Sequence, residues 1–208
     1  MQGGDFIIML LDLLMYENAN VFNLALELLF KTGFRTTAAL KHMESVFLVL
    51  NSEEQTRISR MREDIVTLTN GFHTFESWGV SDSFSNHDAT KFTQMKDICK
   101  RLRYMCSAGG VETGDQSVPD ETVQRNMMDL GLLRAISAAI GVPIAEFSGE
   151  GLSVLKELMK EVCGLLTMFV YENKRNQAAA FKLLTTLRTW FNYGVGMANA
   201  LAAIFLNN

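Results

Sequence analysis

Apolar residues recur every three or four positions along almost the whole chain, and no segment alternates apolar and polar residues as a β-strand would. Only two prolines interrupt the 208 residues, so helices can run without a break. A capped helix, a short helix and a long helix follow one another in the last ninety or so residues. The spacing therefore predicts an all-α protein of about ten antiparallel helices.

Antiparallel helices that follow one another without a strand are typical of an armadillo-like α-solenoid, in which each helical hairpin packs on the next. Softer, glycine-rich or serine-rich stretches separate the helical ones. We expect helical hairpins over 1–78, a loop over 79–89, a connecting helix over 90–107, a flexible glycine-rich loop over 108–117 and a helical domain over 118–208.

The clearest helix boundaries are those of the last domain. Ser117 is the expected cap of its first helix, with Pro119 in the first turn. Gly131 is a natural stop, and a short helix from Leu132 to Ile140 should end at Gly141. The remaining predicted helices are a long one over 151–171, one that buries Phe181, Leu184, Leu187 and Trp190, and an apolar one over 193–206.

The composition is that of a folded globular protein, with 48% hydrophobic and 20% charged residues. A net charge of -4 gives no indication of nucleic-acid binding. Neither a signal peptide nor a membrane-spanning segment is visible, so we expect a soluble chain. Because it begins and stops at helix-like segments, we also expect it to be a piece of something larger.

The residues that most often carry chemistry are not arranged for it. Cys99, Cys106 and Cys163 are an odd number without ligand spacing, and they are predicted to be buried thiols. The three histidines are far apart in the sequence. No nucleophile elbow and no glycine-rich phosphate loop occurs. We therefore predict no catalytic residue, no metal site and no cofactor, and we do not expect an enzyme.

A basic cluster on the connecting helix has two interpretations, and so has the pair Lys174 and Arg175 in the polar segment after the long helix. A solvated helix face is the simpler one, and contact with an acidic partner or an anionic ligand is the alternative. The cluster consists of Lys96, Lys100, Arg101 and Arg103.

A polar segment between the long helix and the next one has a structural explanation. Asn173, Asn176 and Gln177 carry amides that can satisfy the unpaired backbone groups where two helices meet. We predict a structural corner here whose loss would lower stability, not catalysis. With the earlier Arg-Asn-Met helix and its glycine stop, the predicted corner residues are Arg125, Asn126, Gly131, Asn173, Asn176 and Gln177.

These segments resemble the homology domain shared by ryanodine and inositol trisphosphate receptors. The resemblance rests on Arg125-Asn126-Met127, on Leu130-Gly131-Leu132 and on Tyr171-Glu172-Asn173 followed by Asn176-Gln177. The first half is similar, in the same order, to the region that precedes this domain in inositol trisphosphate receptors, at 25–30, 46–52 and 76–78. The loop over 78–89 is shorter than in animal receptors, which suggests a distant homologue such as one from a protist.

The resemblance implies a cytosolic regulatory segment of a tetrameric calcium-release channel, at the cytosolic face of an intracellular calcium store such as the endoplasmic reticulum. It would relay inositol trisphosphate binding toward the pore. Its partners would be other domains of the same receptor, neighbouring subunits and regulatory proteins. The family's ligand and ion sites lie in other parts of the receptor, so none is carried over to this chain. A free-standing armadillo-type adaptor remains the alternative.

Overall fold

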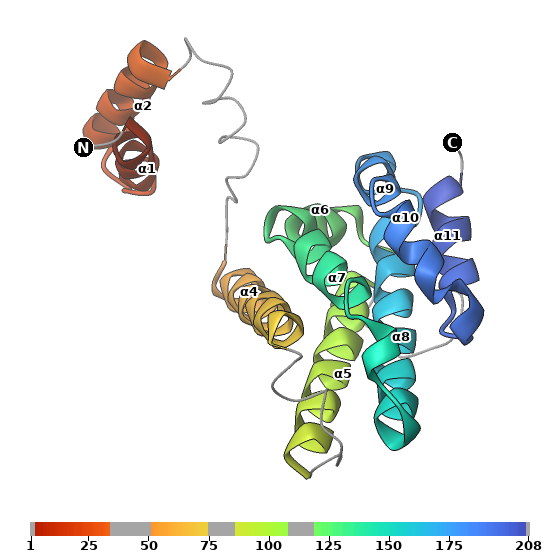
Figure 1. The fold of residues 1–208 in the computed structure, drawn as a ribbon. Coiled ribbons are helices and arrows are strands. Elements are labelled where there is room, and N and C mark those ends of the chain that lie inside the picture. Colours follow the sequence, from red (N-terminus) through yellow and green to blue (C-terminus); the bar gives the residue numbers. More distant parts are fainter. Residues whose placement is uncertain (1–2, 34–50, 75–85, 108–118, 207–208) are drawn as a thin grey trace. The chain divides into compact units, whose positions relative to one another are not determined.

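The computed structural model of the protein describes residues 3–33, 51–74, 86–107 and 119–206 (Figure 1). In these ranges the chain is all-α, with ten α-helices and two short 3-10 helices. They contain no β-strand, and their one β-type pairing is the isolated bridge between Ser107 and Pro119. The all-α prediction is therefore confirmed for this part of the chain.

The chain divides into two compact units, Met1–Leu48 and Val49–Asn208. The predicted boundary after residue 78 and the predicted loop over 108–117 lie outside the described residues, as does most of the predicted loop over 79–89. The helix α4, from Ser52 to His73, belongs to the second unit.

The described part of the first unit is a hairpin of α1 (Gly3–Leu13) and α2 (Ala19–Gly33). Asn18 begins α2, and its side-chain Oδ1 accepts hydrogen bonds from the backbone N–H groups of Asn20 and Val21 at 3.0 and 3.3 Å. This is the capping that an asparagine is suited to provide. Among the side chains of the hairpin that the structure describes, three apolar ones are buried: Leu10, Ala25 and Leu29.

The second unit is built around two long helices, α5 (Asn86–Cys106) and α8 (Gly149–Val170), which pack along each other. The helix α4 packs on α5 and on α7 (Leu132–Ile140). Around the long helices, apolar side chains form one continuous core that runs from Met61 to Ile204. The wide apolar stripe of α8 explains why this helix is central, since such a stripe needs cover on more than one side.

A glycine makes the joint between α6 (Glu121–Asp129) and α7. Gly131 has φ +90°, a left-handed conformation that residues with a Cβ adopt at a cost. The structure gives α7 the predicted bounds, and Gly141 follows its last residue. A single turn of 3-10 helix, Ile144–Glu146, then leads to α8.

The predicted start of α6 was wrong by a few residues. Asp120, not Ser117, begins α6, because its carboxylate accepts hydrogen bonds from the N–H groups of Thr122 and Val123 at 2.8 and 3.2 Å. Pro119 consequently lies outside the helix. The charged oxygen of Asp120 also suits the positive end of the helix dipole, which favours it as the cap.

The helix predicted after the polar corner is broken into three pieces: α9 (Lys174–Phe181), α10 (Leu184–Leu187) and the 3-10 helix η3 (Arg188–Tyr193). The break has a local cause, since the N–H groups of Lys182 and Leu183 bond to carbonyls three residues back, which tightens the turn. Gly194 and Gly196, with φ +69° and +80°, end η3 and begin α11 (Met197–Phe205).

Candidate functional site: a buried amide corner

Three of the six predicted corner residues, Asn173, Asn176 and Gln177, lie at the start of α9, which follows the end of α8 (Figure 1). Glu172 makes the turn with φ +53°, the one described residue other than glycine with a positive φ. A left-handed conformation costs such a residue about 1 kcal/mol, so the surrounding contacts must hold it in place. Those contacts come from side-chain amides.

Asn173 begins α9 and binds in two directions. Its Oδ1 accepts a hydrogen bond from the backbone N–H of Asn176 at 3.1 Å, which caps the helix. Its Nδ2 donates to Oε1 of Gln124, on α6, at 3.0 Å. The cap of α9 is thus tied to a neighbouring helix.

Gln124 lies at the centre of the corner and is 2% exposed. Its Nε2 donates to the carbonyl oxygens of Met168 and Tyr171 at 2.8 and 3.0 Å. These carbonyls belong to the last turn of α8, where backbone acceptors lack partners within the helix. One side chain of α6 therefore caps the end of α8.

Asn176 and Gln177 complete the corner from α9, and both are almost fully buried. Nδ2 of Asn176 donates to the carbonyl of Phe169 at 2.8 Å and to that of Gln124 at 3.4 Å. Nε2 of Gln177 donates to the carbonyls of Ala203 and Leu206 at 2.9 and 3.0 Å, at the end of α11. The amides of this corner thus connect four helices: α6, α8, α9 and α11.

One ion pair borders the corner. Nη2 of Arg175 lies 3.0 Å from Oδ1 of Asp129, whose side chain is only 7% exposed. The pair joins α9 to the end of α6, beside the contact that Gln124 makes.

The structure brings together three of the six predicted residues, Asn173, Asn176 and Gln177. Asn126 is buried on α6, and Gly131 makes the turn after it. Arg125 lies on the exposed side of α6. Gln124 is not among the predicted corner residues: its place on the apolar side of α6 is a signal of burial, but not of the distant carbonyls that it reaches.

The chemistry of the corner is that of neutral groups. Amides neither gain nor lose a proton near neutral pH, so they cannot act as general acids or bases. Asn176 and Gln177 each keep one buried oxygen without a hydrogen-bond partner in the described structure. What this arrangement can do is hold the angles between four helices.

The three cysteines are buried, as predicted, and free. Burial in apolar surroundings raises the pKa of each thiol from 9.0 to about 12: Cys99, Cys106 and Cys163. Because the thiolate is the reactive form, these side chains are inert near neutral pH. Within the ranges that the structure describes, no three His, Cys, Asp or Glu side chains are grouped so that they could hold a metal ion.

Two members of the predicted basic cluster bind neighbouring helices. Arg101 donates from Nε and Nη2 to the carboxylate of Asp64, on α4, at 3.0 and 2.6 Å. This contact raises the pKa of Arg101 further above its usual value. Nη1 of Arg103 lies 3.3 Å from Glu161, on α8. Lys100 is exposed, and Lys96 is half-buried.

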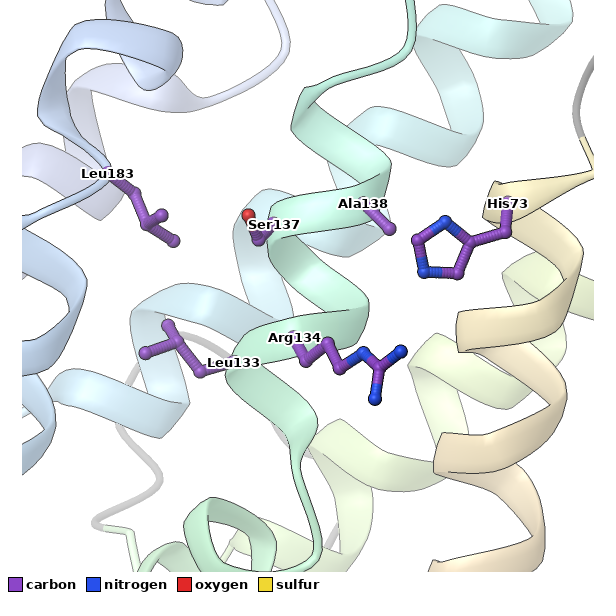
Figure 2. Close-up of a pocket in the computed structure, with 6 residues that line it drawn as sticks. All are labelled: His73, Leu133, Arg134, Ser137, Ala138 and Leu183. Atoms are coloured by element: carbon purple, nitrogen blue, oxygen red, sulfur yellow. The ribbon is translucent and has the colours of Figure 1, made fainter.

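A shallow groove of about 570 Å³ runs along α7, and its lining residues lie on both sides of this helix (Figure 2). Its lining residues are His73, Leu133, Arg134, Ser137, Ala138 and Leu183. Arg134 and Ala138 point toward His73, whereas Ser137 is on the side of Leu183. A serine nucleophile needs its base within hydrogen-bond reach. Ser137 and His73, on opposite sides of the helix, do not form such a pair.

A comparison with the sequence models of known protein families finds no match to this chain. Among the helices that the structure describes, none is both long and apolar enough to cross a membrane. The fold and the corner together define an all-α protein in which buried polar side chains join the helices.

Proposed function

We propose that this chain is a cytosolic regulatory and scaffold segment of an intracellular calcium-release channel of the inositol trisphosphate receptor family. Its task would be mechanical: to relay ligand binding toward the pore of a homotetramer at the membrane of a calcium store. The chain would itself be neither an enzyme nor the binding site of the ligand. Its partners would be other domains of the same receptor, neighbouring subunits and regulatory proteins.

One observation carries the proposal. The residues of the resemblance that lie far apart in the sequence, 125–131 and 171–177, belong to helices that meet in the amide corner. Asn173 and Asn176 each contact α6 directly, through Gln124. Gln124 stands directly before the first of these stretches, and Arg175 pairs with Asp129 within it, which supports a joint between the two helices that carry the motif.

The mechanical role also has a physical basis. A segment transmits a displacement only if its own helices keep their relative angles, because a soft joint would absorb the movement. Buried amides that cap the ends of α8, α9 and α11 stiffen these joints. We further propose that the helices continue as an armadillo-like solenoid, in which such rigid hairpins are stacked. Relay toward a gate would then require two arrangements of the stack with different contacts.

A free-standing armadillo-type adaptor is the second candidate. The groove beside α7 favours it, because a mostly apolar groove between helices is a common place for a bound peptide. The two candidates differ in the native protein that they require: the channel segment would be part of a large membrane protein, whereas the adaptor would be a small protein.

The first experiment is an immunoblot of fractionated source cells with an antibody raised against residues 119–206. A channel segment should give a band far heavier than 23.3 kDa, the mass of this chain, that stays with membranes until detergent is added. A band near 23.3 kDa in the high-speed supernatant would refute the channel and leave the adaptor.

A further inference from the structure

The outer surface of α9 and α11 exposes two phenylalanines side by side. Phe181 and Phe205 are 52% and 49% exposed. Their rings are arranged edge to face, with centroids 5.8 Å apart. Single exposed apolar side chains are ordinary, whereas adjacent large ones commonly mark an interaction surface.

On each of the two helices, exposed residues precede the phenylalanine at the same spacing. On α9, Lys174 and Ala178 precede Phe181 by seven and three residues, and all three are exposed. On α11, Ala198 and Ala202 precede Phe205 by the same intervals and are also exposed. Residues so spaced share one face of a helix. We call this surface the aromatic face: Lys174, Ala178, Phe181, Ala198, Ala202 and Phe205.

The charged side chains that α9, α10, η3 and α11 carry themselves have one sign, although the exposed Glu172 precedes α9. Every charged residue between Asn173 and Leu206 is positive: Lys174, Arg175, Lys182 and Arg188. Arg175 is bound to Asp129, whereas Lys174, Lys182 and Arg188 are exposed and form no ion pair with another described residue. The chain as a whole carries a net charge of -4, so this region differs in sign from the average surface.

The aromatic face is held rigidly. Asn176, on the opposite side of α9, and Gln177, at the border of the face, are buried and hydrogen-bonded to α8 and α11. A surface that is already ordered loses little entropy when a partner binds. The alanine side chains on this face are shorter than the two rings, so the surface has a depression next to the rings. Side chains of a partner helix can pack into such a depression.

We propose that the aromatic face binds an amphipathic α-helix of a partner protein, with apolar residues against Phe181 and Phe205 and flanking Asp or Glu residues against Lys174 and Lys182. An apolar stripe with acidic edges complements both the rings and the charges. An anionic membrane offers the charge, but its flat surface does not fill the step between the rings and the alanines. The inference does not depend on the proposed function, since it applies equally to a channel segment and to an adaptor.

The test uses the full 208-residue chain and a fluorescein-labelled model peptide. The peptide is a helix of about 18 residues with a leucine face and glutamate edges, long enough to be helical when bound. A second peptide has lysine in place of glutamate. We expect fluorescence anisotropy to show the acidic peptide binding about tenfold more tightly than the lysine peptide, with the difference shrinking between about 50 and 200 mM salt.

Two variants test the face itself. Phe181→Ser and Lys174→Glu should each weaken binding of the acidic peptide about fivefold or more, because exposed aromatic and charged anchors contribute strongly at interfaces. Lys174 lies in the first turn of α9, where a carboxylate suits the helix dipole, so Lys174→Glu should leave folding intact. Circular dichroism checks that the helices are retained.

The matched controls are Lys100→Glu and Tyr104→Ser, an exposed lysine and aromatic residue one turn apart on α5. They should change binding less than about twofold, since surface changes outside a contact have small effects. Equal binding of the two peptides, or equal loss in the controls, would overturn the proposal. So would binding of phosphatidylserine vesicles without binding of the acidic peptide, which would indicate a membrane surface instead.

Discussion

The corner at the end of α8 and the contact between α4 and α5 connect helices by different means. Uncharged amides hold the corner, and Gln124 and Asn176 are 2% and 0% exposed. Asp64 and Arg101 hold the other contact, and the Arg101 side chain is 38% exposed. Amides satisfy buried backbone groups without bringing a charge into the core. An ion pair loses less hydration free energy where water still reaches one of its two side chains. The fully buried joint is therefore neutral, whereas the charged one pairs the buried Asp64 with an Arg101 that still reaches water.

The largest expected change in the free energy of unfolding comes from raising the pH. The groups that respond are the buried thiols of α5 and α8, which belong to neither of the two contacts. The native state holds Cys99, Cys106 and Cys163 protonated up to about pH 12, whereas in the unfolded chain they lose their protons near 9.0. The thiols should leave the free energy of unfolding unchanged below pH 9, and above it they should lower this free energy by about 1.4 kcal/mol per thiol for each pH unit.

Urea titrations between pH 7 and 11 measure this loss. Reaction with a disulfide reagent at pH 8 provides the control: the native thiols should react far more slowly than the same thiols in urea. Equal reaction rates in the two states would show that the thiols are accessible and would remove the basis of the alkaline prediction.

Asn176→Asp should be the most damaging substitution in the corner. It removes the donor to Phe169 and places a carboxylate at a fully buried position, at an expected cost of about 4 kcal/mol in the free energy of unfolding. The deficit should be smaller at pH 5 than at pH 8, because a buried carboxyl has a raised pKa and is neutral more readily at low pH.

The midpoint of urea unfolding measures the cost of Asn176→Asp. Asn192→Asp, at an exposed position of η3, is the matched control and should change stability by less than about 0.5 kcal/mol. A similar loss in both variants would contradict the importance of the corner.

Gln124→Leu tests the residue that connects α6 to the other helices. The substitution keeps an apolar body of similar size but leaves the carbonyls of Met168 and Tyr171 without their donor. We expect a loss of about 3 kcal/mol, since buried acceptors are left unsatisfied. Gln94→Leu, at an exposed position of α5, supplies the control for the change of side chain.

Asp64→Asn should cost about 1 kcal/mol, because the contact with Arg101 is partly exposed and screened by water. An asparagine oxygen can still accept from the guanidinium, which limits the loss further. Glu63→Gln, at the exposed neighbouring position, is the control. If Asp64→Asn proved more costly than Gln124→Leu, the comparison between the neutral and the charged joint would have to be reversed.

The smallest effect is expected for Gly164→Ala on α8. A Cβ at this position would lie 2.7 Å from Nη1 of Arg103, which must then move away from Glu161. Alanine favours a helix by about 1 kcal/mol over glycine, and this gain offsets the lost ion pair. Thermal unfolding should therefore show almost no change, and a large loss would indicate that Arg103 cannot move.

The corner shows how far the sequence could predict a site. Asn173, Asn176 and Gln177 were identifiable because polar residues that interrupt two apolar helices have few roles other than capping. Gln124 was missed because it lies 49 residues from Asn173, and no local pattern indicates which distant carbonyls an amide will reach. Arg125 shares the motif but lies on the exposed side of α6.

The predicted helices differ in the same way. The bounds of α7 follow from the sequence, because glycines on both sides of Leu132–Ile140 act locally. The division of residues 174–193 into α9, α10 and η3 does not follow from the sequence, since the apolar spacing of this segment suits one helix. In the fold, the indole of Trp190 donates to the carbonyl of Ile140 at 2.9 Å, a contact across 50 residues.

The sequence by itself determined the all-α class, the order of the helices in the second unit and the polar character of the corner. These properties follow from periodicity and capping, which act over a few residues. Only the tertiary structure decided that Gln124 caps α8, that Arg101 binds Asp64 and that Phe181 lies against Phe205. Such pairings depend on which helix faces meet, and that is a property of the packed core as a whole.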